Sequence, residues 1–394
     1  MELTRTNRIQ SIDILRGLVM IIMALDHTRD FFHQPAIIGN PLDPNTTTIP
    51  IYFTRWITHF CAPTFVFLSG VSAYLSSLKK SKGEASAFLI KRGLWLVLVE
   101  ITFITFGITA KPGFNFIVLQ VIWAIGWSMV ILGVLSRFSP KLVLIVGLLL
   151  FFGHNILDLV NLPQQGVGRN IMAIFFRAFF TIMPLDNTHV VGAIYAILPW
   201  TGVMLLGYSI GTWFNKTFPA EKRKTRLLQL GTGLILLFII LRTINVYGDS
   251  VPRVKGDSFR FNFLAFLNTT KYPPSLLYLS MTLGPSCLAL AFLEKAKGKW
   301  QDIVSVYGKV PFFYYICHFY LLHLILIILF YATGHSNAEI VSPNIPFNFR
   351  PATFGWGLPV VYLIWLFVVT LLYFPCRWYS NYKKTHNQWW LSYV

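Results

Sequence analysis

The sequence predicts an all-α integral membrane protein of about ten transmembrane helices, and three observations lead to this fold class. Hydrophobic residues make up 55% of the 394 residues and charged residues only 12%, with a mean hydropathy of +0.59. Apolar runs of roughly 20 residues, long enough to cross a hydrocarbon core of about 30 Å, recur along the whole chain. The basic residues gather in short clusters between these runs. A soluble globular fold is therefore excluded, and we expect residues 1–394 to form a single transmembrane domain in the lipid bilayer.

Ten apolar segments are expected to span the membrane. In chain order they are Ile12 to Leu25, Ile51 to Leu78, Phe88 to Ala110, Phe114 to Leu135, Leu142 to Val160, Val190 to Phe214, Leu227 to Val246, Pro274 to Leu293, Val310 to Tyr331, and Phe354 to Phe374. The first segment lacks a small-residue cleavage site, so we expect a retained helix and not a removable signal peptide.

One further apolar stretch lies between the fifth and sixth spans. Residues 171–183 read IMAIFFRAFFTIM, which is too short to cross a bilayer and is interrupted by Arg177. This pattern favours a re-entrant or interfacial helix.

The basic clusters alternate by loop, so that all of them fall on one face of the membrane. They are Arg5 and Arg8; Lys79, Lys80, Lys82, Lys91 and Arg92; Arg137 and Lys141; Lys216, Lys222, Arg223, Lys224 and Arg226; Lys295, Lys297, Lys299 and Lys309; and Arg377, Lys383 and Lys384. The positive-inside bias assigns this face, and both chain termini with it, to the cytoplasm. Because the net charge of +18 is explained by topology, no nucleic-acid partner is expected. The longer, less basic loops 27–50, 161–189, 247–272 and 332–353 are expected on the extracytoplasmic side.

The first stretch that carries chemistry is Arg8 to His33, where ionisable residues enter a span that should be apolar. An ionised side chain at mid-bilayer costs roughly 2.5 to 3.5 kcal/mol, so such residues are usually paired and often functional. Asp13 and Arg16 are three residues apart and can neutralise each other as a structural ion pair. His27 follows Arg16 by eleven residues, on nearly the same helix face and about 16 Å further along. This face suits a long anionic ligand with its reactive end at His27, whose imidazole Asp26 can tune.

The second stretch is Arg55 to Leu75, in the second span. Arg55 and His59 lie four residues apart on one face, at about the depth of His27 because this helix enters from the outside. Pro63 is expected to kink the helix or open its hydrogen-bond ladder. Small residues after it allow close helix contact, namely Ser69, Gly70 and Ser72. Packing explains these small residues but not the arginine and the histidine.

The third stretch is Tyr307 to His323, in the ninth span. His318 lies inside an aromatic segment, one turn after Tyr314. A core histidine satisfied by a tyrosine or a carbonyl fits this pattern as well as a site residue does. The membrane histidines have no compact metal-ligand spacing, and the four cysteines occur singly in apolar stretches, as packing residues do. No metal is expected.

These residues resemble those of the transmembrane acyltransferases related to the lysosomal heparan-alpha-glucosaminide N-acetyltransferase. The opening residues are similar to that family's R-x-x-S-x-D-x-x-R-G entry into its first catalytic-domain helix: Arg8, Ser11, Asp13, Arg16 and Gly17. A second group resembles the family's P-x-F-V-F-x-x-G-x-S helix: Pro63, Phe65 to Phe67, Gly70 and Ser72. Looser matches are Leu119, Gln120 and Gly126, and later Gly308, Tyr314 or Tyr315, and His318. The resemblance covers most of the chain in order.

The resemblance offers two candidates for a catalytic base. The lysosomal enzyme has its catalytic histidine in the first extracytoplasmic loop, a position best matched by His33, and an asparagine in the place of His27. The wider family of membrane O-acyltransferases has a histidine eleven residues after the arginine, which selects His27. We favour His27, because a regular helix preorganises it. His59 stands where the lysosomal relatives carry a carboxylate, and the remaining catalytic candidates are Asp26 and His318.

The resemblance implies an acyl-CoA-dependent N- or O-acetyltransferase. Such an enzyme would move an acetyl group from cytoplasmic acetyl-CoA to a sugar or glycan amine or hydroxyl at the outer face. A histidine would act as general base or would carry the acetyl group as an intermediate. The candidates for binding the donor are Asp13, Arg16, Ser69, Ser72, Lys79, Lys80, Arg92 and Gln120.

A bacterial-type member of such a family is expected in the cytoplasmic (inner) membrane, and a homodimer is left open. The competing functional class is a proton-coupled transporter or exporter. In that class, membrane-embedded ionisable residues form a proton or substrate path without covalent chemistry, here Asp13, Arg16, His27 and His59.

Overall fold

The computed structural model describes residues 9–34, 39–341 and 346–393, so Arg8 of the first motif lies outside the described residues. The α-helices are α1 (Gln10–Phe32), α2 (Ile49–Ile57), α3 (Cys61–Ser77), α4 (Lys82–Val99), α5 (Thr105–Thr109), α6 (Val121–Phe138), α7 (Pro140–Gly153), α8 (Gly166–Phe175), α9 (Ile197–Ile210), α10 (Ala220–Ile244), α11 (Phe259–Leu267), α12 (Leu276–Leu293), α13 (Lys299–Lys309), α14 (Pro311–Ala332) and α15 (Leu358–Thr385). Shorter helical turns are η2 (Thr58–Phe60), the π-helix η3 (Glu100–Ile104), η4 (His154–Leu159), η5 (Gly211–Phe214), η6 (Asn337–Glu339) and η7 (Trp389–Ser392). The strands are β1 (Phe116–Leu119), β2 (Thr181–Pro184) and β3 (Val190–Ala193).

Seven helical segments among the described residues are long and apolar enough to cross a membrane. They are Ile49–Ser77, Val121–Phe138, Pro140–Leu159, Ala220–Ile244, Leu276–Leu293, Pro311–Ala332 and Leu358–Thr385. Each coincides with an expected span. The other three expected spans coincide with α1, with α4 continued through η3 and α5, and with α9. The mostly helical membrane architecture is thus found, while the count of ten and the orientation of the termini stay predictions.

The expectation of an all-α chain is wrong at one place, where three short strands form a sheet. The spans expected to begin at Phe114 and Val190 begin instead as β1 and β3, and their helices start only at Val121 and Ile197. β3 lies in the middle of the sheet, parallel to β1 and antiparallel to β2. These strands contain β-branched residues that favour extended backbone, and a short apolar run does not distinguish a strand from a first helical turn.

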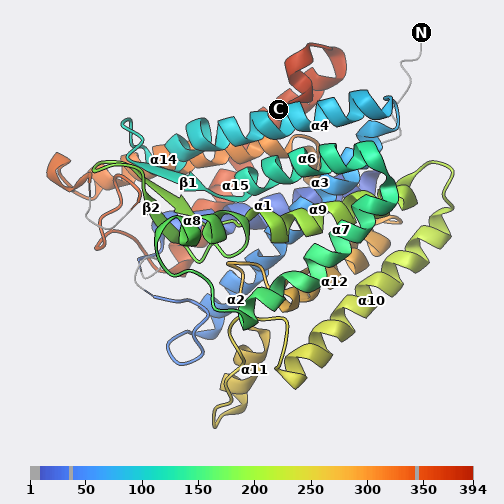
Figure 1. Cartoon of the computed structure of the whole chain (residues 1–394). Coiled ribbons are helices and arrows are strands. Elements are labelled where there is room, and N and C mark those ends of the chain that lie inside the picture. Colours follow the sequence, from blue (N-terminus) through green and yellow to red (C-terminus); the bar gives the residue numbers. More distant parts are fainter. Residues whose placement is uncertain (1–8, 35–38, 342–345, 394) are drawn as a thin grey trace.

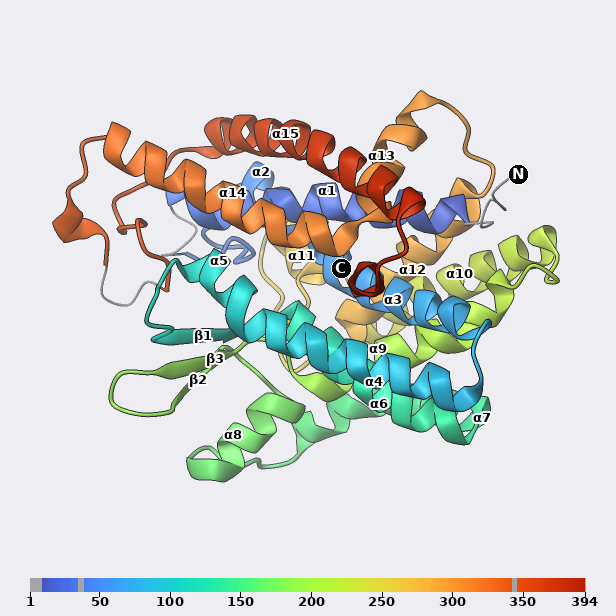
Figure 2. The ribbon, with the colours of Figure 1, turned by 90° about the horizontal axis from the view of Figure 1, so that it is seen from above.

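The apolar stretch 171–183 also divides in a way that the sequence did not predict. α8 covers its first residues and begins earlier, at Gly166, whereas β2 takes up its end. Arg177 lies between them and pairs with Asp158 at 3.2 Å. Figures 1 and 2 place α8 and the sheet at the same end of the helix bundle. The predicted interfacial helix is therefore shorter, and a strand follows it.

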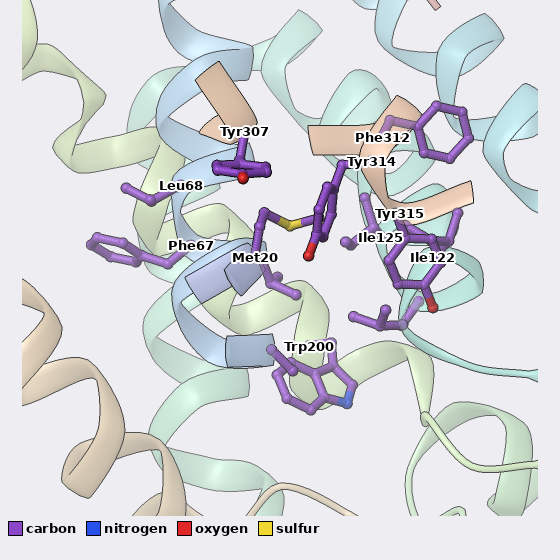
Figure 3. Close-up of a cluster of buried hydrophobic side chains, with 14 of the residues drawn as sticks. Met20, Phe67, Leu68, Ile122, Ile125, Trp200, Tyr307, Phe312, Tyr314 and Tyr315 are labelled. Carbon is purple, nitrogen blue, oxygen red and sulfur yellow. The ribbon is translucent and has the colours of Figure 1, made fainter. Parts of the chain in front are cut away.

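α1 packs against α3, α12, α13, α14 and α15, and this makes it the central helix of the bundle. Two glycines allow its close approach to α13. A Cβ atom on Gly17 would lie 2.1 Å from the carbonyl oxygen of Val304, and one on Gly308 only 1.8 Å from that of Asp13. Figure 3 shows part of the apolar core around α1, which includes Met20. A larger side chain at either glycine would push α13 away from α1.

α2 and α3 form one span with a break in the middle. The turn η2 interrupts the helix one turn before Pro63, the third residue of α3, which has no N–H to donate to the carbonyl of His59. That carbonyl instead accepts a hydrogen bond of 2.8 Å from the Tyr278 hydroxyl. Further along, a Cβ atom on Gly70 would lie 2.1 Å from the carbonyl oxygen of Met204 on α9. The predicted opening of the hydrogen-bond ladder and the predicted close contact are both found.

Candidate functional site

A cavity of about 1170 Å³ lies between α1, α3, α4 and the basic connections next to them. Eight of its lining side chains are Lys or Arg, against one Asp. The basic ones are Arg16, Lys79, Lys80, Arg92, Lys216, Arg223, Lys309 and Lys383. We call this space the cationic cavity. Its volume and its charge suit a long ligand that carries phosphate groups.

The cationic cavity brings together seven of the eight residues that the sequence suggested for donor binding. They are Asp13, Arg16, Ser69, Ser72, Lys79, Lys80 and Arg92. The eighth, Gln120, lies elsewhere. Four further basic residues of this cavity had counted only as topology signals, namely Lys216, Arg223, Lys309 and Lys383. The sequence revealed their charge, but only the packing of the helices brings them to one space.

Arg16 ties α1 to two neighbouring helices at the wall of this cavity. Its guanidinium donates to the hydroxyl of Ser72 on α3 at 2.6 Å and to the carbonyl oxygen of Gly308 on α13 at 3.1 Å. The predicted pair with Asp13 is present at 3.5 Å. Neutralising Asp13 is therefore one of several interactions of Arg16, whose guanidinium is fixed in a defined position.

A second cavity, of about 40 Å³, lies further along α1 beside His27. Its polar lining consists of Asp26, His27, Thr58, Gln120, Tyr195, Lys271 and Tyr315. We call it the His27 cavity. Phe65 of α3 lines both this cavity and the cationic cavity, so its side chain borders both spaces.

His27 is positioned by a second histidine, from α14. Nδ1 of His27 lies 2.6 Å from Nε2 of His318, and the ring centroids are 4.9 Å apart. Nδ1 of His318 lies 3.3 Å from the carbonyl oxygen of Tyr314; since a carbonyl oxygen only accepts, this nitrogen carries the proton. A neutral His318 then accepts at Nε2, and His27 donates from Nδ1. The lone pair of His27 Nε2 is left to take up a proton.

Asp26, beside His27, belongs to a buried network of charges. Arg55 from α2 donates to both carboxylate oxygens of Asp26, at 2.6 Å to Oδ1. Arg29 lies 3.4 Å from Asp26 and 2.6 Å from Asp30. The contact with Asp26 confirms that Arg55 lies at the depth of His27. Hydrogen bonds and opposite charges compensate the cost of burying these groups.

Residues 8–246 match the family described as heparan-alpha-glucosaminide N-acetyltransferase, catalytic. The chain belongs to this family. No curated protein matches the chain. The matched residues include Arg16, His27 and Gln120, whereas His318 and Lys271 come from the part of this acetyltransferase that follows them.

Three of the predicted catalytic residues of this acetyltransferase line neither cavity: His318, which contacts His27, and also His33 and His59. His33 follows α1, and its carbonyl accepts a hydrogen bond of 2.8 Å from Arg350. Burial lowers the pKa of His33, and the nearby Arg29 and Arg350 lower it further. His59 is buried, and neither of its ring nitrogens has a hydrogen-bond partner in the described part of the chain. The geometry therefore favours His27 over His33.

Two residues near the His27 cavity were not singled out from the sequence. Glu100, in the π-helix η3, accepts a 2.9 Å hydrogen bond from the backbone N–H of Gln120 and so fixes the start of α6 at this cavity. Glu100 is an ionisable residue inside a predicted span, as Asp13 and Arg16 are, and this signal could have identified it from the sequence. Lys271 lines the cavity itself but lies in a polar connection before α12, where nothing in the sequence distinguishes it from other surface lysines.

Proposed function

We propose that this protein transfers an acetyl group from cytoplasmic acetyl-CoA to an amino or hydroxyl group of a sugar or glycan at the extracytoplasmic face. One observation carries the proposal: the cationic cavity and the His27 cavity follow each other along α1 and share Phe65 as a lining residue. A ligand with phosphate groups at one end and a reactive group at the other would reach both spaces at once. Acetyl-CoA has this form, because its nucleotide phosphates and its thioester are joined by a long, flexible arm.

The donor would lie along α1. Lysines and arginines of the cationic cavity would bind its phosphates by charge-assisted hydrogen bonds, while Arg16 would face its arm. About 16 Å of helix separates Arg16 from His27. The thioester would pass Phe65 and stop beside His27.

His27 would act as the general base. The acceptor's nitrogen or oxygen attacks the thioester carbonyl carbon and forms a new bond, while Nε2 of His27 removes the acceptor's proton. The tetrahedral intermediate then breaks its carbon–sulfur bond, and the thiolate of CoA leaves and takes a proton from His27. In this scheme His318 is a positioning residue, because it fixes the tautomer of His27 without touching the substrate.

An acetyl-histidine intermediate is the other route, and it would use the same Nε2 lone pair. The two routes differ in whether acetyl remains on the protein when no acceptor is present. Incubation with labelled acetyl-CoA alone, followed by denaturation, separates them: label on the wild type but not on His27→Ala indicates the intermediate.

The decisive experiment incubates purified protein, in detergent or in vesicles, with labelled acetyl-CoA and a panel of amino sugars and glycans. The family's name makes a glucosamine-terminated glycan the first acceptor to test. We expect labelled product with the wild type and a much lower rate with His27→Ala. Acetyl-CoA should also raise the Tm as its occupancy increases, and dephospho-CoA, with one phosphate fewer, should do so only at higher concentration. A proton-coupled transporter would give no labelled product and no such ligand dependence.

A further inference from the structure

Lys271 is a buried cation in the His27 cavity. It is 8% exposed and belongs to the connection between α11 and α12. Within the described ranges, no carboxylate lies within 4.0 Å of its ammonium group and no hydrogen bond to that group is found. Its ammonium group lies over the ring of the adjacent Tyr272, with Nζ 5.1 Å from the ring centroid.

The ion pairs described beside this cavity do not include Lys271. Asp26 is engaged by Arg55 and Arg29, and Asp30 is engaged by Arg29. Two carboxylates thus pair with two arginines, and Lys271 lines the cavity outside these pairs. Glu100, the third carboxylate near this cavity, accepts a hydrogen bond from the backbone N–H of Gln120, and within the described ranges it lies more than 4.0 Å from the ammonium group of Lys271. A cation in a buried site without a matched anion is costly, which indicates that an anionic group forms or binds beside it.

We propose that Lys271 stabilises the oxyanion of the acyl-transfer step, and this inference rests on the function proposed above. When the acceptor attacks the thioester, the π electrons of the carbonyl move onto its oxygen, which becomes negatively charged. Lys271 donates a hydrogen bond to that oxygen while His27 holds the acceptor's proton. An electron pair of the oxyanion then forms the carbonyl double bond again as the thiolate of CoA leaves.

The size of the cavity argues for the oxyanion and against a permanent anion on the acceptor. A volume of about 40 Å³ holds few atoms, comparable to one or two water molecules. The reacting atoms of the thioester and the acceptor would take up this space beside His27, which argues against an additional carboxylate, sulfate or phosphate group there. The ammonium group of Lys271 is thus directed to the reacting atoms.

The test compares Lys271→Met, which keeps the length of the side chain but removes its charge, with Lys271→Arg, which keeps the charge. We expect Lys271→Met to lower kcat by about 10² to 10³, as loss of an oxyanion-hole donor does, while the Kd for acetyl-CoA changes less than about threefold. Lys271→Arg should retain more activity than Lys271→Met. Lys255→Met is the matched control, because Lys255 is exposed in the preceding connection; it should match the wild type.

The outcomes are distinguishable. A wild type that transfers no acetyl group overturns the proposed function and this inference together. An active wild type with an equally active, folded Lys271→Met overturns this inference alone. If Lys271→Met raises only the KM for the acceptor and leaves kcat unchanged, Lys271 binds an anionic acceptor and the oxyanion assignment is wrong.

A charge-restoration experiment covers the case in which Lys271→Met folds poorly. Lys271→Cys is made together with Cys61→Ala, because Cys61 lines the same cavity. Aminoethyl methanethiosulfonate attaches a primary ammonium group through a disulfide, whereas methyl methanethiosulfonate attaches a neutral methyl group. Activity that returns only with the ammonium reagent, and is lost again on reduction, supports the inference. Equal activity after both reagents contradicts it.

Discussion

The cationic cavity and the His27 cavity hold their polar groups in different ways. In the cationic cavity, eight basic side chains surround one large space, and some of them, such as Lys79 and Lys80, are exposed. In the His27 cavity, by contrast, single polar groups are held by specific partners, as His27 is by His318 and Asp26 is by Arg55. In the cationic cavity, many basic side chains would contribute to phosphate binding, and salt can screen each of them. In the His27 cavity each of these groups is individually important, and the predictions below test this contrast.

The largest effect is expected from His27→Ala. Loss of the base should lower kcat by about 10² to 10⁴, while the Kd for acetyl-CoA changes little because the cationic cavity is intact. His33→Ala is the matched control and should keep turnover within about threefold of the wild type, since His33 lines neither cavity. Steady-state kinetics and equilibrium binding check both values. An inactive His33→Ala beside a His27→Ala with normal turnover would reverse the assignment.

Asp26→Asn should give the next largest effect, on stability. It leaves the buried guanidinium groups of Arg55 and Arg29 without full compensation, and breaking such a pair costs about 3–5 kcal/mol. The matched control is Glu221→Gln, because Glu221 pairs with Lys295 at 3.0 Å in an exposed ion pair, and its Tm should not change measurably. Thermal unfolding in detergent measures both.

A double variant decides whether the charge itself is the cause. Asp26→Asn combined with Arg55→Met removes both partners and should recover part of the lost stability, since no full charge of this pair remains buried. If the double variant is less stable than the sum of the two single changes, hydrogen bonding and packing, not charge compensation, dominate at this site.

Gly308→Ala should have an intermediate effect, and it falls on the cationic cavity. A Cβ atom would lie 1.8 Å from the carbonyl oxygen of Asp13, so α13 must move, at a cost of about 1–3 kcal/mol. Because the Gly308 carbonyl accepts a hydrogen bond from Arg16, the affinity for acetyl-CoA should fall as well. Gly233→Ala, in the middle of α10 with no atom within 4 Å, should leave both the Tm and the affinity at or above the wild-type values.

The parts of the fold that depend on local composition could be predicted from the sequence. Apolar length located the seven long spans, and Pro63 and Gly70 indicated the break and the close contact in the second span. The sheet could not be predicted, because β1 and β3 are separated by about 70 residues along the chain, and each is as apolar as the helix after it. Their pairing depends on long-range contacts that no local pattern contains.

The candidate site also has one part that could be predicted from local sequence and one part that depends on long-range contacts. The basic clusters beside the spans supplied the charges of the cationic cavity, and helix periodicity placed Arg16 and His27 on one face. The partners of the His27 cavity come from distant elements: His318 from α14, Gln120 from the start of α6, and Lys271 from a connection. The sequence named two of these three as candidates, but only the packing shows that they meet. Lys271 carried no local signal at all.

A smaller effect is expected when single exposed lysines of the cationic cavity are replaced. Lys79→Met should weaken acetyl-CoA binding by about threefold or less, because several other cations surround the same phosphates and solvent screens each of them. Raising the salt concentration should weaken binding by the wild type more than any single substitution does, with kcat nearly constant. Binding that is insensitive to salt would contradict the assignment of this cavity to phosphate groups.

The smallest effect, none on stability or turnover, is expected from two cysteine substitutions that test which cavity faces the cytoplasm. Asn45 lies in the connection after α1, on the side of the His27 cavity. Gly83 lies in the first turn of α4, next to the basic connection beside the cationic cavity. Both positions are exposed. By the positive-inside bias, Asn45→Cys should react with an impermeant thiol reagent added to intact cells, whereas Gly83→Cys should react only after the membrane is opened. The wild type supplies the background, since three of its four cysteines are buried and Cys317 is half-buried. The opposite labelling pattern would place the cationic cavity outside, where no acetyl-CoA is made, and would remove the proposed donor from its site even if every contact described above were correct.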